Sequence, residues 1–233
     1  MSRNNVILNI PHSSAFGFNA EEWSDPEEIT RHMREWTDWH TEKLFKPRQM
    51  TECIHPCLFP FSRFYVDAER LDNDPMEAIG QGVIYRRFGE ARRQLTAEEE
   101  AARMGIYRRY LNAFEPLIAN STVIVDCHSF PGRLAPDVDF CIGFNEDESR
   151  PDDKTINGIT HTIRKYGYRV AVNHPFSNSI TPVKPITYKS IVIEVNKHTY
   201  MDEDTLQPMP NAYYVSRVIN TILNGFVEGY FQR

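Results

Sequence analysis

Apolar residues along this chain gather in short runs that are rich in β-branched and aromatic side chains and are bounded by turn-forming residues. Runs of this kind are typical of β-strands that are buried on at least one face. They predict strands at residues 6–10, 63–66, 83–85, 122–126, 140–143, 169–172 and 190–195.

Between the predicted strands, apolar residues recur at steps of three or four, which predicts helices with one buried face. The clearest helix covers residues 96–118, because Thr96 can cap it and three acids, Glu98 to Glu100, stand in its first turn, where the helix dipole favours them. Further helices are predicted at residues 26–45, 154–166 and 211–227. Their expected buried positions include Met104, Tyr107, Leu111, Phe114 and Ile118 in the first helix and Tyr214, Val218, Ile219, Ile222 and Phe226 in the last.

The alternation of strands and helices predicts an α/β sandwich around a largely parallel sheet. With 233 residues, 41% of them hydrophobic, the chain can bury one substantial core, so we expect a single domain over residues 1–233. The loop-like stretch at residues 177–185 is the longest, and it could border a substrate site.

The charge and the cysteine content narrow the possible partners and the location. A formal net charge of −6 argues against a nucleic-acid partner, because binding to phosphates relies on clustered basic residues. No apolar run reaches the roughly 20 residues of a membrane helix and no signal-like segment follows Met1, so no membrane partner is expected. Four cysteines suit a reducing compartment, and we expect a cytoplasmic protein.

Three polar residues stand within or directly after apolar runs. His12 follows residues 6–11, His128 follows residues 123–127, and Glu194 lies inside residues 191–195. Ligands of α/β proteins collect at the carboxyl ends of parallel strands. Two imidazoles and a carboxylate placed there indicate a metal-dependent hydrolase, with zinc favoured by the ligand types and other divalent ions also possible.

The third metal ligand is left open by the sequence. Asp38 is the most attractive carboxylate, although its spacing alone favours an ordinary exposed acid on a helix, and Glu21, Glu22 and His40 compete with it. His12 alone could be a turn histidine that is satisfied by backbone hydrogen bonds.

The acids beside these candidates have roles of their own. Asp126, two residues before His128, could orient a ligating imidazole from behind. Glu194 lies in a run so apolar that burial of its carboxylate is costly unless the group is paired or used in catalysis. We interpret it as catalytic, with a buried ion pair as the alternative.

Two arginines flank a predicted short strand. Arg63 and Arg70 could clamp an acidic substrate through paired donors or polarise a scissile carbonyl. Equally, they could form a structural salt-bridge network with Asp67, Glu69 and Asp72.

Other signatures are weak or missing. Cys53, His55 and Cys57 form only a faint rival zinc motif, since no second cysteine pair accompanies them. The sequence contains no phosphate-binding glycine loop, no His-Glu-x-x-His and no Gly-x-Ser-x-Gly, so nucleotide cofactors and serine-esterase chemistry rank low.

At these residues the chain resembles the N-formylglutamate amidohydrolase family, relatives of the zinc carboxypeptidases and aspartoacylases. The matching segments follow the order of the family and comprise residues 9–14, 37–39 with 44–45, 62–64 with 67–70, 125–129, and 193–196 with 200–203. The resemblance implies a three-layer α/β/α sandwich with a mixed, largely parallel sheet of the zinc-exopeptidase (phosphorylase/hydrolase-like) type. It also implies a zinc-dependent amidohydrolase that cleaves the amide of an N-acyl amino acid, N-formyl compounds among them.

Residue roles follow from the same resemblance. It implies metal ligation by His12, Asp38 and His128, with the Asp126 carboxylate orienting a ligating imidazole. It also implies proton transfer by Glu194, which activates water at the zinc. It further implies that Arg63 steadies the developing oxyanion and that Arg70 binds the carboxylate of a small acidic or peptide-like substrate. Asn196 and Tyr200 are the remaining expected substrate contacts.

Departures from the family pattern lie on the substrate side. Ser14 stands where the family usually has glycine, Glu69 stands where it often has asparagine, and Ser177 follows Pro175-Phe176 where glycines are usual. The reaction type is therefore better supported than the substrate. A catalytically silent protein that binds a small acid, and a carboxypeptidase or deacylase acting on a larger substrate, remain alternatives.

Overall fold

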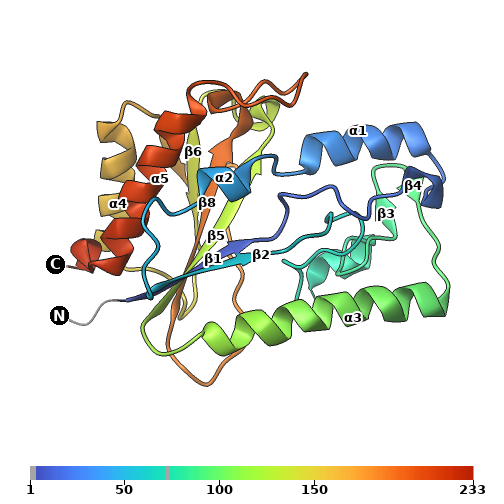
Figure 1. The fold of residues 1–233 in the computed structure, drawn as a ribbon, viewed down its shortest axis with the longest axis horizontal. Coiled ribbons are helices and arrows are strands. Elements are labelled where there is room, and N and C mark those ends of the chain that lie inside the picture. The colour runs from blue at the N-terminus through green and yellow to red at the C-terminus, as the bar shows by residue number, and fades with distance from the viewer. Residues whose placement is uncertain (1–3, 72–73, 233) are drawn as a thin grey trace. The chain divides into compact units, whose positions relative to one another are not determined.

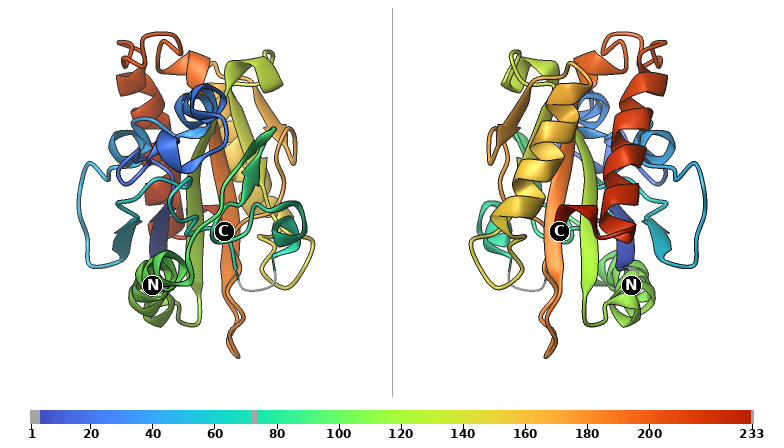
Figure 2. Two further views of the ribbon diagram at one scale, coloured as in Figure 1. Left: turned by 90° about the vertical axis from the view of Figure 1, so that its right-hand side faces the viewer. Right: turned by 90° about the vertical axis from the view of Figure 1, so that its left-hand side faces the viewer.

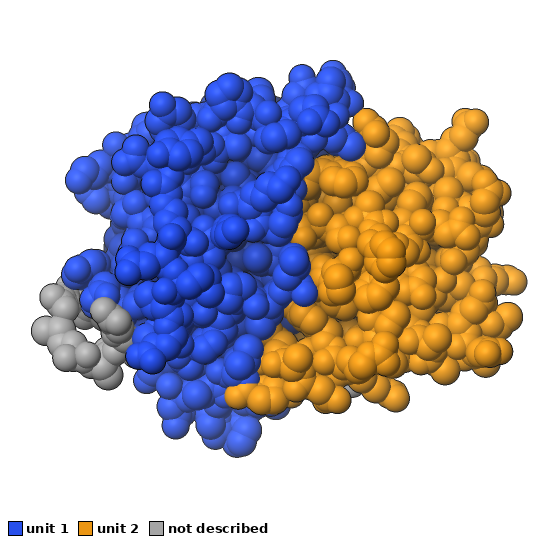
Figure 3. All heavy atoms as spheres, in the orientation of Figure 1, with its two compact units in different colours: residues 1–10, 40–58, 117–233 blue, residues 11–39, 59–116 orange. Residues whose placement is uncertain are grey.

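The structure is a computed structural model that describes residues 4–71 and 74–232. It divides into two compact units, which are shown in different colours in Figure 3. Unit 1 consists of Met1–Ile10, His40–Leu58 and Leu117–Arg233, and unit 2 consists of Pro11–Trp39 and Phe59–Pro116. The expected single domain over the whole chain stays a prediction.

Unit 1 is built on a six-stranded sheet with the strand order β2-β1-β5-β8-β6-β7 (Figure 1). The pairs from β2 to β8 are parallel, whereas β6 is antiparallel to β8, so the sheet is mixed and mostly parallel. This confirms the predicted α/β class. The strands are β1 (Asn5–Ile10), β2 (Ile54–Leu58), β5 (Thr122–Phe130), β6 (Phe140–Gly143), β7 (Val170–Val172) and β8 (Lys189–Asn196).

The central strands were predictable because they are buried on both faces. Every residue of β5 is buried, and a strand of this kind reads as a continuous apolar run. The sequence did not predict β2, because Pro56 interrupts its strand-like pattern of residues. Since β2 is an edge strand, the N–H that Pro56 lacks is not needed for a second ladder.

The helices of unit 1 are α2 (Thr41–Leu44), α4 (Asp153–Lys165) and α5 (Ala212–Val227). α4 and α5 lie side by side on one face of the sheet, as Figure 2 shows. α4 begins where the Asp152 carboxylate accepts a hydrogen bond of 2.7 Å from the Thr155 N–H. In α5 the predicted burial of Tyr214 is wrong, because Val215, three residues before Val218, takes the buried position.

Unit 2 contains α1 (Pro26–Trp36), the two-stranded sheet of β3 (Arg87–Phe88) and β4 (Ala91–Arg92), α3 (Ala97–Phe114), and the 3-10 turns η1 (Ala20–Glu22) and η2 (Pro75–Ile79). Thr96 caps α3 as predicted, and the structure adds that Thr96 and Glu99 form a capping box. The helix ends at Phe114, earlier than predicted, and passes into the 3-10 turn Glu115–Leu117, because Pro116 has no N–H to donate.

Two further predictions for unit 2 are wrong. Residues 63–66 and 83–85 form no strand, although Phe64, Val66 and Tyr85 are buried there. Their aromatic and β-branched side chains fill a core, while the backbone folds into turns; for example, the Val66 N–H donates to the Ser62 carbonyl at 3.0 Å. Burial alone therefore accounts for the strand-like composition.

The predicted helix at residues 26–45 is also interrupted. α1 ends at Trp36, Thr37 is extended, and His40 adopts a left-handed conformation with a φ of 68° before α2 begins. Asp38 therefore lies in a non-helical link and is almost fully buried, rather than being exposed on a helix. Among the described residues, none of the helices has the length and apolarity that crossing a membrane requires.

Candidate active site

Asp67 is the centre of the polar cluster in unit 2. Its fully buried carboxylate lies 2.7 Å from Nε2 of His12 and accepts a hydrogen bond from the Tyr85 hydroxyl. The guanidinium nitrogens of Arg63 and Arg70 approach it to 3.4 and 3.7 Å. Burial alone would raise the pKa of Asp67, but His12 and the arginines outweigh burial and hold that pKa well below its usual range.

His12 follows Ile10, the last residue of β1, by two residues. Its ring presents Nε2 to Asp67 and Nδ1 toward Asp38, whose Oδ2 lies 3.8 Å away. The Asp38 N–H donates to the His12 carbonyl at 2.9 Å, so a main-chain hydrogen bond keeps the two residues together. The interruption between α1 and α2 thus brings Asp38 to His12.

Arg63 and Arg70 take part in a salt-bridge network with Asp67, which is one of the two roles that the sequence left open for them. The Nε of Arg63 donates to the Tyr85 hydroxyl at 3.2 Å, and Arg70 also faces Asp74 at 3.8 Å. Burial disfavours the charged form of Arg63, but Tyr85 and Asp67 outweigh it, and its pKa is raised. Burial also raises the pKa of Tyr85. The third acid weighed from the sequence, Asp72, lies outside the described residues.

In unit 1, Asp126 and His128 lie on the same face of β5, since they are two residues apart on a strand. Oδ1 of Asp126 lies 3.1 Å from Nε2 of His128 and accepts a hydrogen bond of 2.7 Å from the Asn9 amide. Oδ2 of Asp126 accepts a hydrogen bond of 3.0 Å from the Ile180 N–H. Burial would raise the pKa of Asp126, but His128 and these donors lower it. His128 lies inside β5, which runs on to Phe130, rather than after its end as expected.

Glu194 lies on β8, directly opposite His128 in the parallel register of β5 and β8. Residues that face each other in this way project to the same side of a sheet. Its side chain is nearly buried, at 8% exposure. Within unit 1, a carboxylate and an imidazole of the predicted site therefore lie on neighbouring strands.

Asn196 and Tyr200 are both fully buried in this structure. The Asn196 side-chain N–H groups donate to the Ala135 and Val138 carbonyls at 3.1 and 2.8 Å. The Asn196 side-chain oxygen accepts a hydrogen bond of 3.2 Å from the His198 N–H. These bonds hold the segment after β8 in place. A substrate contact by Asn196 or Tyr200 stays a prediction.

Two of the competing metal candidates, Glu22 and His40, are engaged elsewhere. Glu22 accepts two hydrogen bonds of 2.8 Å from Arg103, and Nε2 of His40 lies 2.9 Å from the Leu206 carbonyl. Burial raises the pKa of Cys57 to about 11, which disfavours the thiolate that zinc requires. Among the described residues, the groups with metal-ligand spacing contain no cysteine.

Tyr85 is a member of the cluster that sequence reasoning missed. A phenol at the end of the apolar run Val83-Ile84-Tyr85 is the available signal, but the run has the composition of a strand. The sequence presents Asp67 only as a possible partner of the arginines, because nothing in the local sequence links it to His12.

The donor atoms present suit a divalent metal. Each unit offers a histidine whose Nε2 faces a carboxylate, His12 with Asp67 and His128 with Asp126, which is the arrangement that orients ligating imidazoles. In unit 2, His12, Asp67 and Glu69 each offer a ligand atom, and these atoms lie within 4.8 Å of one another. Nitrogen and carboxylate donors of this kind fit zinc.

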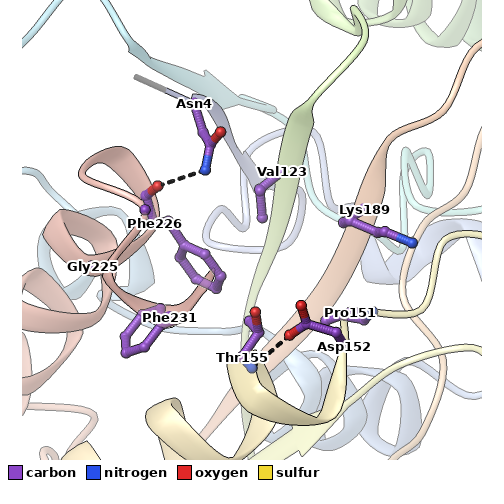
Figure 4. A pocket seen from close by; sticks show the side chains of 10 residues that line it. Asn4, Val123, Pro151, Asp152, Thr155, Lys189, Gly225, Phe226 and Phe231 are labelled. Carbon is purple, nitrogen blue, oxygen red and sulfur yellow. Dashed lines mark hydrogen bonds between the residues drawn. The ribbon is translucent and has the colours of Figure 1, made fainter. Parts of the chain in front are cut away.

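A cavity of about 60 Å³ in unit 1 is separate from these residues (Figure 4). It lies beside Val123 and Lys189, at the amino ends of β5 and β8, and the rings of Phe226 and Phe231 line it. His128 and Glu194 lie toward the other ends of those strands.

Comparisons with solved structures concern the fold. The chain is similar to the N-formylglutamate amidohydrolase from Ralstonia eutropha JMP134, with 21% identity and a TM-score of 0.78, over 100% of this chain and 96% of that chain. A gene product from Agrobacterium tumefaciens is 15% identical with a TM-score of 0.62, over 96% of this chain and 92% of that chain. These likenesses confirm the three-layer α/β fold.

The comparison with protein families concerns the sequence itself. None of the curated proteins compared with the chain matches it in sequence. The model of the family described as FGase, N-formylglutamate amidohydrolase, matches residues 4–201. Since this match spans most of the chain, the protein belongs to the N-formylglutamate amidohydrolase family and is a hydrolase of that type.

Proposed function

We propose that this protein is a zinc-dependent amidohydrolase that cleaves the amide bond of N-acyl amino acids, N-formyl amino acids among them. The observation that carries the proposal is the pairing of each candidate histidine with a buried carboxylate, His12 with Asp67 and His128 with Asp126. Family membership supports the reaction class.

His12, Asp38 and His128 would hold the metal. Asn9 and Asp126 are paired in the parallel register of β1 and β5. His12 follows Asn9 by three residues, and His128 follows Asp126 by two. This connectivity supports convergence of the two imidazoles on one ion, and Asp38 accompanies His12. When bound, zinc supplies a Lewis acid that polarises the amide carbonyl and lowers the pKa of water.

Glu194 would move the proton. Its carboxylate takes a proton from the attacking water and then delivers it to the nitrogen of the leaving amine. The position of Glu194 opposite His128 supports this role, because it places the carboxylate beside a candidate metal ligand.

The arginines would bind the substrate. Arg63 steadies the developing oxyanion, and Arg70 binds the α-carboxylate of the amino acid through its paired donors. The hydrogen bond from Arg63 to Tyr85 and the shared contact with Asp67 support a fixed orientation of both guanidinium groups.

Metal content tests the proposal most directly. Protein purified without chelator should contain about one zinc per chain, and His12→Ala and His128→Ala should lose it while remaining folded. His161→Ala is the matched control, because His161 lies exposed on α4. Zinc-loaded protein should then hydrolyse members of a panel of N-formyl and N-acetyl amino acids.

Other results would redirect the assignment. Absence of zinc in the wild type even after zinc is supplied, together with binding of small acids without turnover, would favour the silent binding protein. Turnover confined to peptides or larger acylated substrates would favour a carboxypeptidase or deacylase.

A further inference from the structure

We infer that Glu69 sets the substrate specificity of this protein by excluding N-acyl amino acids with an acidic side chain and favouring those with a neutral or cationic one. The inference rests on the proposed function, because it concerns the substrate of the same site. It deepens that proposal by naming the class of amino acid.

The backbone fixes Glu69 within the cluster of unit 2. Its N–H donates to Oδ1 of Asp67 at 3.0 Å, and its Oε2 lies 3.7 Å from Nε2 of His12. The side chain of Glu69 is 23% exposed, whereas those of His12 and Asp67 are fully buried. Glu69 therefore presents a carboxylate at the accessible border of the cluster, where a ligand can meet it.

The charges around the two arginines are already balanced by acids. Arg63 faces Asp67 at 3.4 Å, while Arg70 faces Asp67 at 3.7 Å and Asp74 at 3.8 Å. Glu69 adds a third carboxylate to these two guanidinium groups, and its charge acts on both of them. This part of unit 2 therefore has no surplus of positive charge with which to neutralise two substrate carboxylates.

One substrate carboxylate can still be bound. The side chain of Arg70 is 19% exposed and can offer paired donors to the α-carboxylate that every N-acyl amino acid carries. A second carboxylate, on the amino-acid side chain, would meet the like charge of Glu69 in a partly desolvated setting. Like charges placed opposite each other are a common means of rejecting a wrong ligand.

The same carboxylate would accept hydrogen bonds from a donor. A side-chain carboxamide or ammonium group supplies N–H donors and no negative charge, so it would pair with Glu69 where a carboxylate is repelled. The preferred class is therefore the N-acyl derivatives of amino acids with neutral or cationic side chains, rather than of dicarboxylic amino acids.

The test compares substrates of nearly the same shape. Zinc-loaded wild type is assayed for kcat/KM with N-formyl-L-glutamate, N-formyl-L-glutamine and N-formyl-L-lysine. We expect glutamine and lysine to exceed glutamate by about tenfold or more, since a like charge a few ångströms away costs at least that at a partly exposed site. Glu69→Gln and Glu69→Asn should each remove most of this preference, mainly by improving the glutamate derivative.

Glu98→Gln is the matched control, because Glu98 is exposed in the first turn of α3, and its preference should equal that of the wild type. Circular dichroism and thermal unfolding establish that the variants are folded. A wild type that prefers the glutamate derivative, or a preference unchanged in both Glu69 variants, overturns the inference while leaving the amidohydrolase proposal intact.

Binding separates the two proposals if no substrate is turned over. Calorimetric titration of the same three compounds would then show tighter binding of glutamine and lysine derivatives, lost in Glu69→Gln. That result would support the role of Glu69 and contradict the amidohydrolase. Equal affinities, or no binding of any of the three, would overturn the role of Glu69 as well.

Discussion

Nε2 of His12 lies 2.7 Å from Oδ1 of Asp67, and neither side chain is accessible to solvent. The two residues are 55 positions apart in the sequence. Because one ring nitrogen is held by a carboxylate, the orientation of the imidazole is fixed, and its Nδ1 is directed toward Asp38. A histidine held in this way is a better metal ligand than one that rotates freely, since its tautomer and direction are set before the metal arrives.

Asp67→Asn is expected to weaken zinc binding by about 10- to 100-fold, because the amide no longer fixes the His12 ring or raises its basicity. Competition with a fluorescent chelator measures the affinity. Asp137→Asn, at a fully exposed side chain, serves as the control and should bind zinc like the wild type. Equal affinities for Asp67→Asn and the control would remove Asp67 from the metal site.

Glu194→Gln is expected to keep zinc and the fold but to lose about 10²- to 10⁴-fold in kcat, because the amide cannot accept a proton from water. Kinetics on the best N-formyl substrate, with zinc content measured on the same samples, check this. Glu148→Gln, an exposed site of the same unit, should be as active as the wild type. Full activity of zinc-replete Glu194→Gln would contradict the proposed proton transfer.

Asp139 gives unit 1 a pH-dependent contribution to stability. Its carboxylate accepts hydrogen bonds of 2.8 Å from the Arg169 backbone N–H and 2.7 Å from the guanidinium. Burial would raise the pKa of Asp139, but the bonds from Arg169 outweigh it and lower the pKa below its usual value. A group with a lowered folded pKa stabilises the protein above its unfolded pKa, and this stability is lost as the pH falls through the folded pKa.

Asp139→Asn should therefore reduce the free energy of unfolding by about 1 kcal/mol at pH 7, a modest figure because solvent screens part of the pair. The difference from the wild type should shrink as the pH falls below about 4. Urea unfolding at pH 7 and at pH 3 measures both values. A difference that is constant or grows toward low pH would show that the charge of Asp139 is not what stabilises the fold.

The ring of Phe231 packs against two glycines, Gly158 of α4 and Gly225 of α5, and a Cβ at either glycine would collide with it. Gly225→Ala is expected to destabilise the protein by about 1–3 kcal/mol through overpacking, although alanine favours a helix. In a Phe231→Ala background the same change should be neutral or stabilising. Thermal or urea unfolding of the wild type, both single variants and the double variant checks this. Additive changes in the free energy of unfolding would mean that the Phe231 ring does not pack against Gly225.

The sequence by itself determined the strands β1, β5, β6 and β8, because strands buried on both faces are continuous apolar runs. It also determined the starts of α1 and α3, where Asp25 and Thr96 cap the first turn. Capping and burial periodicity are local properties, and a local pattern can be read without knowing the fold. The candidate chemistry on His12, His128 and Glu194 was visible for the same reason.

Tertiary structure alone decided the rest. Residues 63–66 and 83–85 carry the composition of strands but pack as turns, because their partners in the core come from other segments of unit 2. Asp67 became the centre of the cluster only when folding brought His12 and Tyr85, 55 and 18 positions away, to its carboxylate. Such contacts depend on long-range packing, and the energy of a buried charge is set by all the groups around it rather than by its neighbours in sequence.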